Sequence, residues 1–165
     1  MSFDRLIDAI RQKQNPTVAG LDPKLEYIPS YIVKGAIEEY GETLEGAAAA
    51  VFTYNCGLID ALADIVPAVK PQAAYYERFG WPGMRALAQT IEYARQKGMY
   101  VITDGKRNDI GSTMEAYAAA HLGRVKVGSR EYRVFAGDAL TVNGYLGTDG
   151  IKPLLDICAK EDAGI

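Results

Sequence analysis

A chain of 165 residues can bury the core of one domain, and its 48% hydrophobic and 24% charged residues are typical of a globular protein. The net charge of −3 argues against a nucleic-acid surface, and no apolar run approaches the ~20 residues of a membrane span. Cys56 and Cys158 lack the spacing of a metal site or a disulfide framework, so we expect buried free thiols. Because the amino-terminal residues show no signal-peptide pattern, we expect a cytoplasmic protein.

Helices and short strands alternate along the chain. Residues 2–14 carry apolar side chains at helical spacing, with Ser2 as the expected N-cap, and Asn15-Pro16 ends this helix. Residues 17–21 form a short strand that Asp22-Pro23 stops. The remaining expected elements are, in chain order, a helix of undefined extent between Pro29 and Gly41, a helix over 42–64, a strand over 68–71, a helix over 83–98, a strand over 100–103, a helix over 113–122, a mixed polar insertion over 123–135, a strand over 139–143 and a helix over 151–161.

Four strand–helix units in succession imply parallel strands joined by right-handed crossovers. Short apolar strands that end in polar, Gly or Pro residues predict a (β/α)8 TIM barrel. A doubly wound sheet is the alternative, but no Gly-x-Gly-x-x-Gly turn follows the first strand. Since a complete barrel needs about 250 residues, we expect residues 1–165 to be one domain, the amino-terminal part of a barrel truncated before strand five. Two copies that close one another are the alternative.

Charged residues gather at the end of the third strand. Asp104 and Lys106 are two residues apart, so an extended chain points both side chains to one side. Asp109 lies beyond the strand and is free to face another partner. Chemistry in α/β barrels sits at these strand ends, and a carboxylate next to an ammonium can bind a ligand and pass a proton. The other strand ends supply Asp22, Lys70 and Asn143.

The run from Asp104 to Thr113, Asp-Gly-Lys-Arg-Asn-Asp-Ile-Gly-Ser-Thr, resembles the hallmark of the orotidine 5′-phosphate decarboxylase family. The resemblance covers essentially the whole chain in the right order. Segments similar to the long-chain bacterial branch are Ala19–Pro23, Val69–Gln72, Tyr76-Glu77 and Thr141–Gly147.

The resemblance implies conversion of orotidine 5′-monophosphate to uridine 5′-monophosphate in pyrimidine biosynthesis, without metal or cofactor. By the family's pattern Lys106 donates a proton to C6, and Asp104 lies beside the substrate carboxylate. Asp109 belongs to the site of the other subunit in a homodimer, so the catalytic set is Lys106, Asp104, Asp109 and Lys70.

The substrate-binding set implied by the resemblance is Asp22, Ile110, Thr113 and Asn143. Asp22 and Lys70 contact the ribose hydroxyls, Thr113 of the partner helps there, and Ile110 lines the pyrimidine pocket. The sequence departs from the family at Gly105, where a larger apolar residue is expected, and at Gly144, which replaces a usual Pro. No residue matches the family's phosphate clamp or its pyrimidine-facing polar groups.

Two alternatives stay open. Sugar-phosphate decarboxylases and aldolases of the same superfamily also carry Asp-x-Lys-x-x-Asp and use it with Mg²⁺ to stabilise an enediolate. A half-barrel that binds a nucleotide or a partner chain without catalysis is the other alternative. We expect His121 to be structural, and the basic residues of the 123–135 insertion to be solvated.

Overall fold

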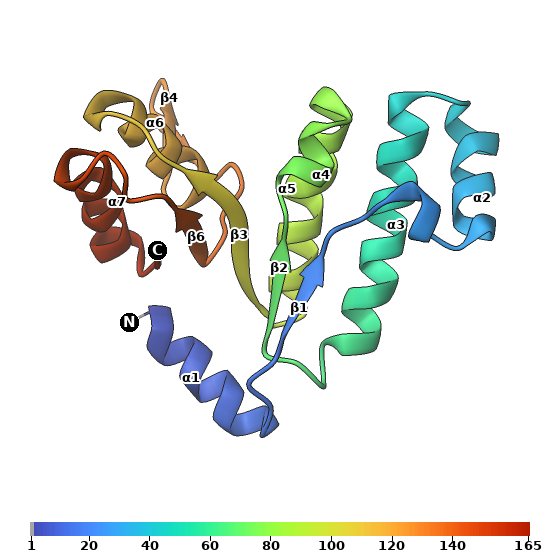
Figure 1. The fold of residues 1–165 in the computed structure, drawn as a ribbon, viewed down its shortest axis with the longest axis horizontal. Coiled ribbons are helices and arrows are strands. Elements are labelled where there is room, and N and C mark those ends of the chain that lie inside the picture. Colours follow the sequence, from blue (N-terminus) through green and yellow to red (C-terminus); the bar gives the residue numbers. More distant parts are fainter. Residues whose placement is uncertain (1) are drawn as a thin grey trace.

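A four-stranded parallel sheet forms the centre of the computed structural model, which describes residues 2–165 (Figure 1). The strand order is β1-β2-β3-β6, and each neighbouring pair is parallel. The sheet therefore confirms the parallel pairing expected from the alternation of strands and helices. Its strands are β1 (Val18–Leu21), β2 (Ala68–Pro71), β3 (Tyr100–Arg107) and β6 (Ala139–Val142).

Helices cover the sheet in two groups. Both groups lie on one face: α3 packs against α5 near β1 and β2, with α2 outside α3, and α6 packs against α7 near β3 and β6 (Figure 1). Helix α1 lies across the amino ends of the strands. The helices are α1 (Ser2–Lys13), α2 (Ser30–Tyr40), α3 (Leu44–Leu62), α4 (Ala74–Glu77), α5 (Gly80–Gln96), α6 (Gly111–His121) and α7 (Thr148–Glu161), with a short 3₁₀ helix at Leu25–Tyr27.

Three elements differ from expectation. Helix α4 was not expected, and α5 begins at Gly80 rather than Gly83, because Pro82 is tolerated in a first helical turn. Strand β3 continues through the charged residues to Arg107, where the Asn143 N–H donates to the Arg107 carbonyl (3.0 Å). Charge does not stop this strand because its polar side chains lie at the open end of the sheet.

The segment expected as a polar insertion contains an antiparallel hairpin. Strand β4 (Val125–Val127) pairs with β5 (Arg130–Tyr132), and all six residues are exposed, as expected for a solvated segment. The connecting Gly128 has a φ of 61°, which suits the tight turns that join hairpin strands.

The two faces of the sheet have different neighbours. Val69 and Val101 point into the main hydrophobic core beneath α3 and α5. Ala68, Tyr100 and Ala139 point the other way and form a small cluster against α1. Because side chains alternate along a strand, Lys70, Asp104, Lys106 and Thr141 share the face of this second cluster.

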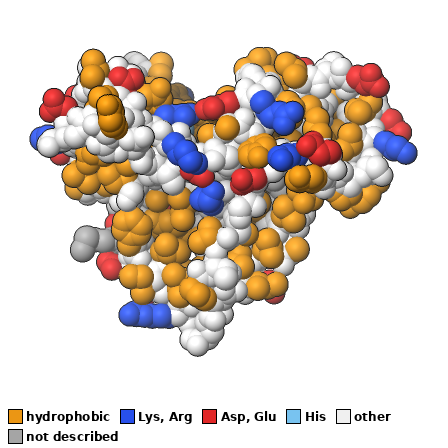
Figure 2. Space-filling model, viewed as in Figure 1, with side chains coloured by type: hydrophobic (Ala, Val, Ile, Leu, Met, Phe, Trp, Pro, Cys, Tyr) orange, Lys and Arg blue, Asp and Glu red, His pale blue; other side chains and the backbone are white. Residues whose placement is uncertain are grey.

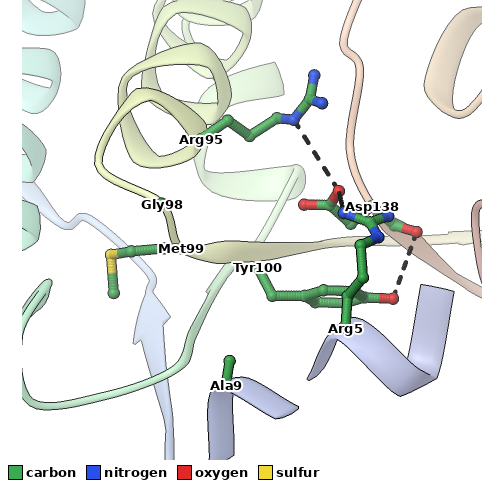
Figure 3. Close-up of a pocket in the computed structure, with 7 residues that line it drawn as sticks. All are labelled: Arg5, Ala9, Arg95, Gly98, Met99, Tyr100 and Asp138. Carbon is green, nitrogen blue, oxygen red and sulfur yellow. Dashed lines mark hydrogen bonds and ion pairs between the residues drawn. The ribbon is translucent and has the colours of Figure 1, made fainter. Parts of the chain in front are cut away.

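A polar cluster ties α1 to the amino ends of the strands (Figure 3). Arg5 and Arg95 both reach Oδ1 of the buried Asp138, at 3.0 and 4.0 Å. The Ser2 hydroxyl, expected to cap α1, is instead buried, 2.5 Å from the Tyr100 hydroxyl and 3.1 Å from the Asp138 carbonyl oxygen. These contacts stabilise the docking of α1 rather than its helical start.

After α7 the chain returns to the sheet and forms one isolated bridge beside β6. Gly164 bridges to Ala139 in parallel, with Leu140 N–H donating to the Gly164 carbonyl (3.0 Å) and Gly164 N–H to the Asp138 carbonyl (2.9 Å). Cys56 and Cys158 are free and half-buried. Within residues 2–165, no helix combines the length and apolar character needed to cross a bilayer.

Candidate active site

The Asp104 carboxylate is the centre of a charged array at the carboxyl ends of β2 and β3. Lys106 Nζ lies 2.6 Å from Oδ1, and Lys70 Nζ lies 2.7 Å from Oδ2. The contact between Asp104 and Lys106 confirms that these side chains share one side of the strand. The Asp104 side chain is 9% exposed, whereas that of Lys106 is 64% exposed. The array thus has a buried anion and an ammonium that reaches into the open end of the sheet.

Two neutral groups complete the environment of Asp104. Gln72 Nε2 donates to Oδ2 (3.0 Å), and the Thr141 hydroxyl donates to Oδ1 (2.7 Å). Each carboxylate oxygen therefore accepts one charged and one neutral donor. Neither residue was among the predicted site residues, although Gln72 lies in the Val-Lys-Pro-Gln segment and Thr141 shares the sheet face of Lys70, Asp104 and Lys106.

These donors keep Asp104 ionised. Burial alone would raise the pKa of the Asp104 carboxyl, but hydrogen bonds from Lys106, Lys70 and Thr141 outweigh it and hold the pKa well below its usual range. The carboxylate therefore remains an anion across the physiological pH range. This fixed anion attracts the two lysine side chains and holds their Nζ atoms within 2.7 Å of its oxygens.

The backbone at Lys106 is unusual for a side-chain-bearing residue. Its φ is 49°, in the left-handed region that favours glycine, and it lies where the pairing of β3 with β6 shifts register. The Lys106 N–H donates to the Thr141 hydroxyl (3.0 Å). Bulges of this kind re-aim side chains next to active sites.

The other predicted site residues surround the array without joining it. Asp22 follows β1 and is exposed, and Asp109 follows β3. The Asp109 carboxylate accepts the Ile110 N–H (2.8 Å), and within residues 2–165 it makes no ion pair with Lys106 or Lys70.

Ile110 is 60% exposed and Thr113 is exposed in the first turn of α6, so both face solvent. Asn143 follows β6, but its Oδ1 accepts the Tyr145 N–H (2.8 Å). Its side chain therefore stabilises its own turn rather than contacting the charged array.

Arg107, the last residue of β3, follows the array directly. Its Nη2 lies 2.6 Å from Glu77, its Nη1 donates to the Gly105 carbonyl (2.7 Å), and its guanidinium lies 5.4 Å from the centre of the Tyr117 ring. Gly105 itself has little room: an added Cβ would lie 3.0 Å from Leu140 Cδ1. A larger residue here requires Leu140 to move.

Charged side chains gather over the upper middle of the face shown in Figure 2, between the two groups of helices. Figure 1 places the carboxyl ends of the central strands in this region. The surface beneath is mostly hydrophobic or uncharged. One cluster of ionised residues thus lies at the end of the sheet where barrel enzymes bind their substrates.

Sequence comparison finds close relatives of this chain. It is 40% identical over 162 residues to an orotidine 5′-phosphate decarboxylase of Caldicellulosiruptor saccharolyticus. This alignment covers 98% of this chain and 53% of that protein. It is 44% identical over 157 residues to the protein of the same name in Rhodopirellula baltica. This alignment covers 95% of this chain and 50% of that protein. The chain therefore spans about half the length of the curated relatives it matches.

Solved structures share its fold. An orotidine 5′-phosphate decarboxylase structure from Streptomyces avermitilis superposes with a TM-score of 0.77 at 32% identity, over 99% of this chain and 50% of that chain. Leishmania donovani OMP decarboxylase superposes with a TM-score of 0.69 at 26% identity, over 94% of this chain and 49% of that chain. The fold is thus that of the first four βα units of a TIM barrel, as expected.

The family model of the orotidine 5′-phosphate decarboxylase / HUMPS family matches residues 29–165, which include the whole charged array. The relatives and the superposed structures agree with this match in name and in fold. The chain therefore belongs to the orotidine 5′-phosphate decarboxylase / HUMPS family.

Proposed function

We propose that the protein carrying this chain converts orotidine 5′-monophosphate to uridine 5′-monophosphate in the cytoplasm, as a step of pyrimidine biosynthesis, without a cofactor. The observation that carries the proposal is the Lys70–Asp104–Lys106 array, with its exposed ammonium held 2.6 Å from a buried carboxylate. The names of relatives up to 44% identical support the choice of substrate.

In the proposed reaction the bond between C6 and the carboxylate breaks, CO₂ leaves, and the electron pair stays on C6. Lys106 lies at the open end of the sheet and donates its proton to that carbon, which forms the C6–H bond of the product. The resulting amine then takes a proton from water. A nearby fixed ammonium also stabilises the developing negative charge, which lowers the barrier to the loss of CO₂.

Asp104 has two proposed roles. It attracts the Lys106 ammonium and directs it at C6, and it lies beside the substrate carboxylate. Because four donors hold it as an anion, the site is organised before substrate arrives. Such preorganisation lowers the barrier because the protein need not reorganise during the reaction.

The remaining predicted residues are proposed to bind substrate. Asp22 and Lys70 contact the ribose hydroxyls, and Ile110 lines the pyrimidine pocket. Asn143 is proposed as a substrate contact that leaves its turn when substrate binds. Asp109 and Thr113, which stand away from the array of their own chain, are proposed to act in the site of the second subunit of a homodimer.

The test is turnover of orotidine 5′-monophosphate by the full-length protein in the presence of EDTA. We expect activity there, and Lys106→Ala to lower kcat by about 1,000-fold or more, since the residue supplies both proton and charge. Lys152→Ala is the matched control, because Lys152 is an equally exposed lysine paired with Asp156 on α7. Its kcat should match that of the unsubstituted protein.

Two outcomes would overturn the proposal. Activity that requires Mg²⁺ and ignores the nucleotide indicates a sugar-phosphate enzyme of the same superfamily. Binding of the nucleotide with no turnover by the unsubstituted protein indicates a binding module.

A further inference from the structure

Thr141 faces three residues of the neighbouring strand at once. In the pairing of β3 with β6, Thr103 lies opposite Leu140 and Arg107 lies opposite Val142. Residues 104–106 therefore share the single position Thr141 between those two pairs. This is where the ladder of backbone hydrogen bonds is interrupted, so a side chain has to satisfy the groups left over.

The Thr141 hydroxyl uses both of its hydrogen-bonding capacities in this gap. It accepts the Lys106 N–H (3.0 Å) and donates its own proton to Asp104 Oδ1 (2.7 Å). The same Oδ1 accepts Lys106 Nζ (2.6 Å). Hydroxyl, carboxylate and ammonium thus close a ring that begins and ends on Lys106.

This ring matters because the backbone of Lys106 is strained. A residue with a side chain in the left-handed region is held there only when its surroundings favour it. The Lys106 N–H donates to the Thr141 hydroxyl, which ties this backbone conformation to the neighbouring strand β6. Removing the hydroxyl takes away the acceptor of this N–H and one of the four hydrogen-bond donors to Asp104.

We propose that Thr141 is a positioning residue of this site: one hydroxyl fixes both the Lys106 backbone and the Asp104 carboxylate, and so directs the Lys106 ammonium. The inference rests on the function proposed above, because that function gives Lys106 its role. Thr141 itself is not proposed to touch the reacting carbon.

Thr103 provides a matched control. It is one residue before Asp104 on β3 and fully buried, and its hydroxyl has no hydrogen-bond partner within residues 2–165. Thr→Val removes a hydroxyl at almost constant volume at either position. Only at Thr141 does the change break hydrogen bonds.

The first measurement is steady-state kinetics on the full-length protein with Thr141→Val, Thr141→Ser and Thr103→Val. We expect Thr141→Val to lower kcat by about 10- to 100-fold, since small misplacement of a catalytic group has effects of this size. KM should change by less than about threefold, because ground-state contacts remain. Thr141→Ser keeps the hydroxyl and should recover most of kcat, and Thr103→Val should match the unsubstituted protein.

The second measurement is independent of turnover: a pH titration of the Asp104 carboxyl by ¹³C NMR in the same variants. We expect its pKa to rise in Thr141→Val and to stay low in Thr141→Ser and Thr103→Val. If Thr141→Val does not fold, Thr141→Ala takes its place, because a smaller side chain introduces no clash.

Unchanged kcat and an unchanged Asp104 titration in Thr141→Val would overturn the inference, as would equal losses in Thr141→Val and Thr103→Val. If the unsubstituted protein does not turn over the nucleotide, the proposed function fails. The titration then decides by itself whether Thr141 orders the Asp104–Lys106 pair.

Discussion

His121 is buried without a partner for one of its ring nitrogens. The residue is 3% exposed and its ring stacks on Phe135 with centroids 4.9 Å apart, and Nδ1 has no hydrogen-bond partner within residues 2–165. Burial lowers the pKa of His121 to about 4, the positive charge of Arg107 adds to this, and Glu77 opposes it. These contacts support the expectation that His121 is structural.

A pH dependence of stability follows. The unfolded chain binds a proton to His121 near pH 6.5, whereas the folded chain does so only near pH 4. Protonation therefore favours the unfolded state, so this contribution to stability is complete above about pH 6.5 and is lost as the pH falls toward 4. Between about pH 7.5 and 5 the loss is on the order of 2 kcal/mol in the free energy of unfolding.

Urea unfolding at several pH values measures this loss. In His121→Phe, which keeps an aromatic ring against Phe135, we expect the decline between about pH 7.5 and 5 to be smaller by that amount. An equal decline in both proteins would show that other groups cause it.

Residue spacing predicted only part of the candidate site. The i, i+2 spacing of Asp104 and Lys106 was sufficient to predict their contact, because strand alternation is local. The positions of Gln72 and Thr141 depend on register between strands, which the sequence does not specify. Asn143 was predicted to bind substrate, yet its side chain accepts a hydrogen bond within its own turn, which spacing along the chain does not reveal.

At the scale of elements, the close contact of α4 with α5 depends on Gly83. A Cβ added there would overlap the Tyr76 carbonyl oxygen and lie 2.9 Å from Phe79 Cβ. Tyr76 belongs to α4 and Phe79 to the short connection into α5, and both residues are buried, so neither has free space to move into. Glycine is thus required at position 83 because α4 and α5 approach closely there, and not because its backbone adopts a conformation that favours glycine.

We therefore expect Gly83→Ala to lower the free energy of unfolding by roughly 1–3 kcal/mol, despite the better helix propensity of alanine. The matched control is Gly57→Ala within α3, where nothing lies within 4 Å of an added Cβ. That variant should gain about 0.5–1 kcal/mol. Chemical denaturation of both variants measures the difference, and stabilisation by both changes would refute the close contact.

Helices and strands with a strong periodic pattern were predicted well, whereas short or irregular ones were not. The 42–64 helix corresponds to α3 (Leu44–Leu62) and the 68–71 strand to β2, because each has a continuous pattern and clear stop residues. Helix α4 is too short for a periodic signal. The β4–β5 hairpin was missed although Gly128-Ser129 is a turn signal, because its exposed strands lack a buried face.

At the scale of the whole molecule, the proposed homodimer predicts that two inactive variants restore each other. If Asp109 acts in the partner's site, Lys106→Ala and Asp109→Ala are each inactive as homodimers. A mixed dimer contains one site with both intact residues. Since random exchange gives half mixed dimers, we expect about one quarter of full activity after mixing and refolding.

Activity measured before and after subunit exchange tests this, with the Lys106→Ala homodimer carried through the same steps as the control. No recovery after exchange, with mixed dimers verified by native mass spectrometry, would mean that each site is built from one chain.

Strand β3 carries two different kinds of residue along its length. Tyr100, at its start, belongs to the cluster that docks α1, whereas Asp104 and Lys106, near its end, form the charged array. Contacts that hold the fold together and residues that meet a ligand thus occupy opposite ends of one strand. Selection or laboratory engineering can therefore alter reactivity at one end while the anchoring at the other is preserved, so changes in specificity need not come at the expense of folding.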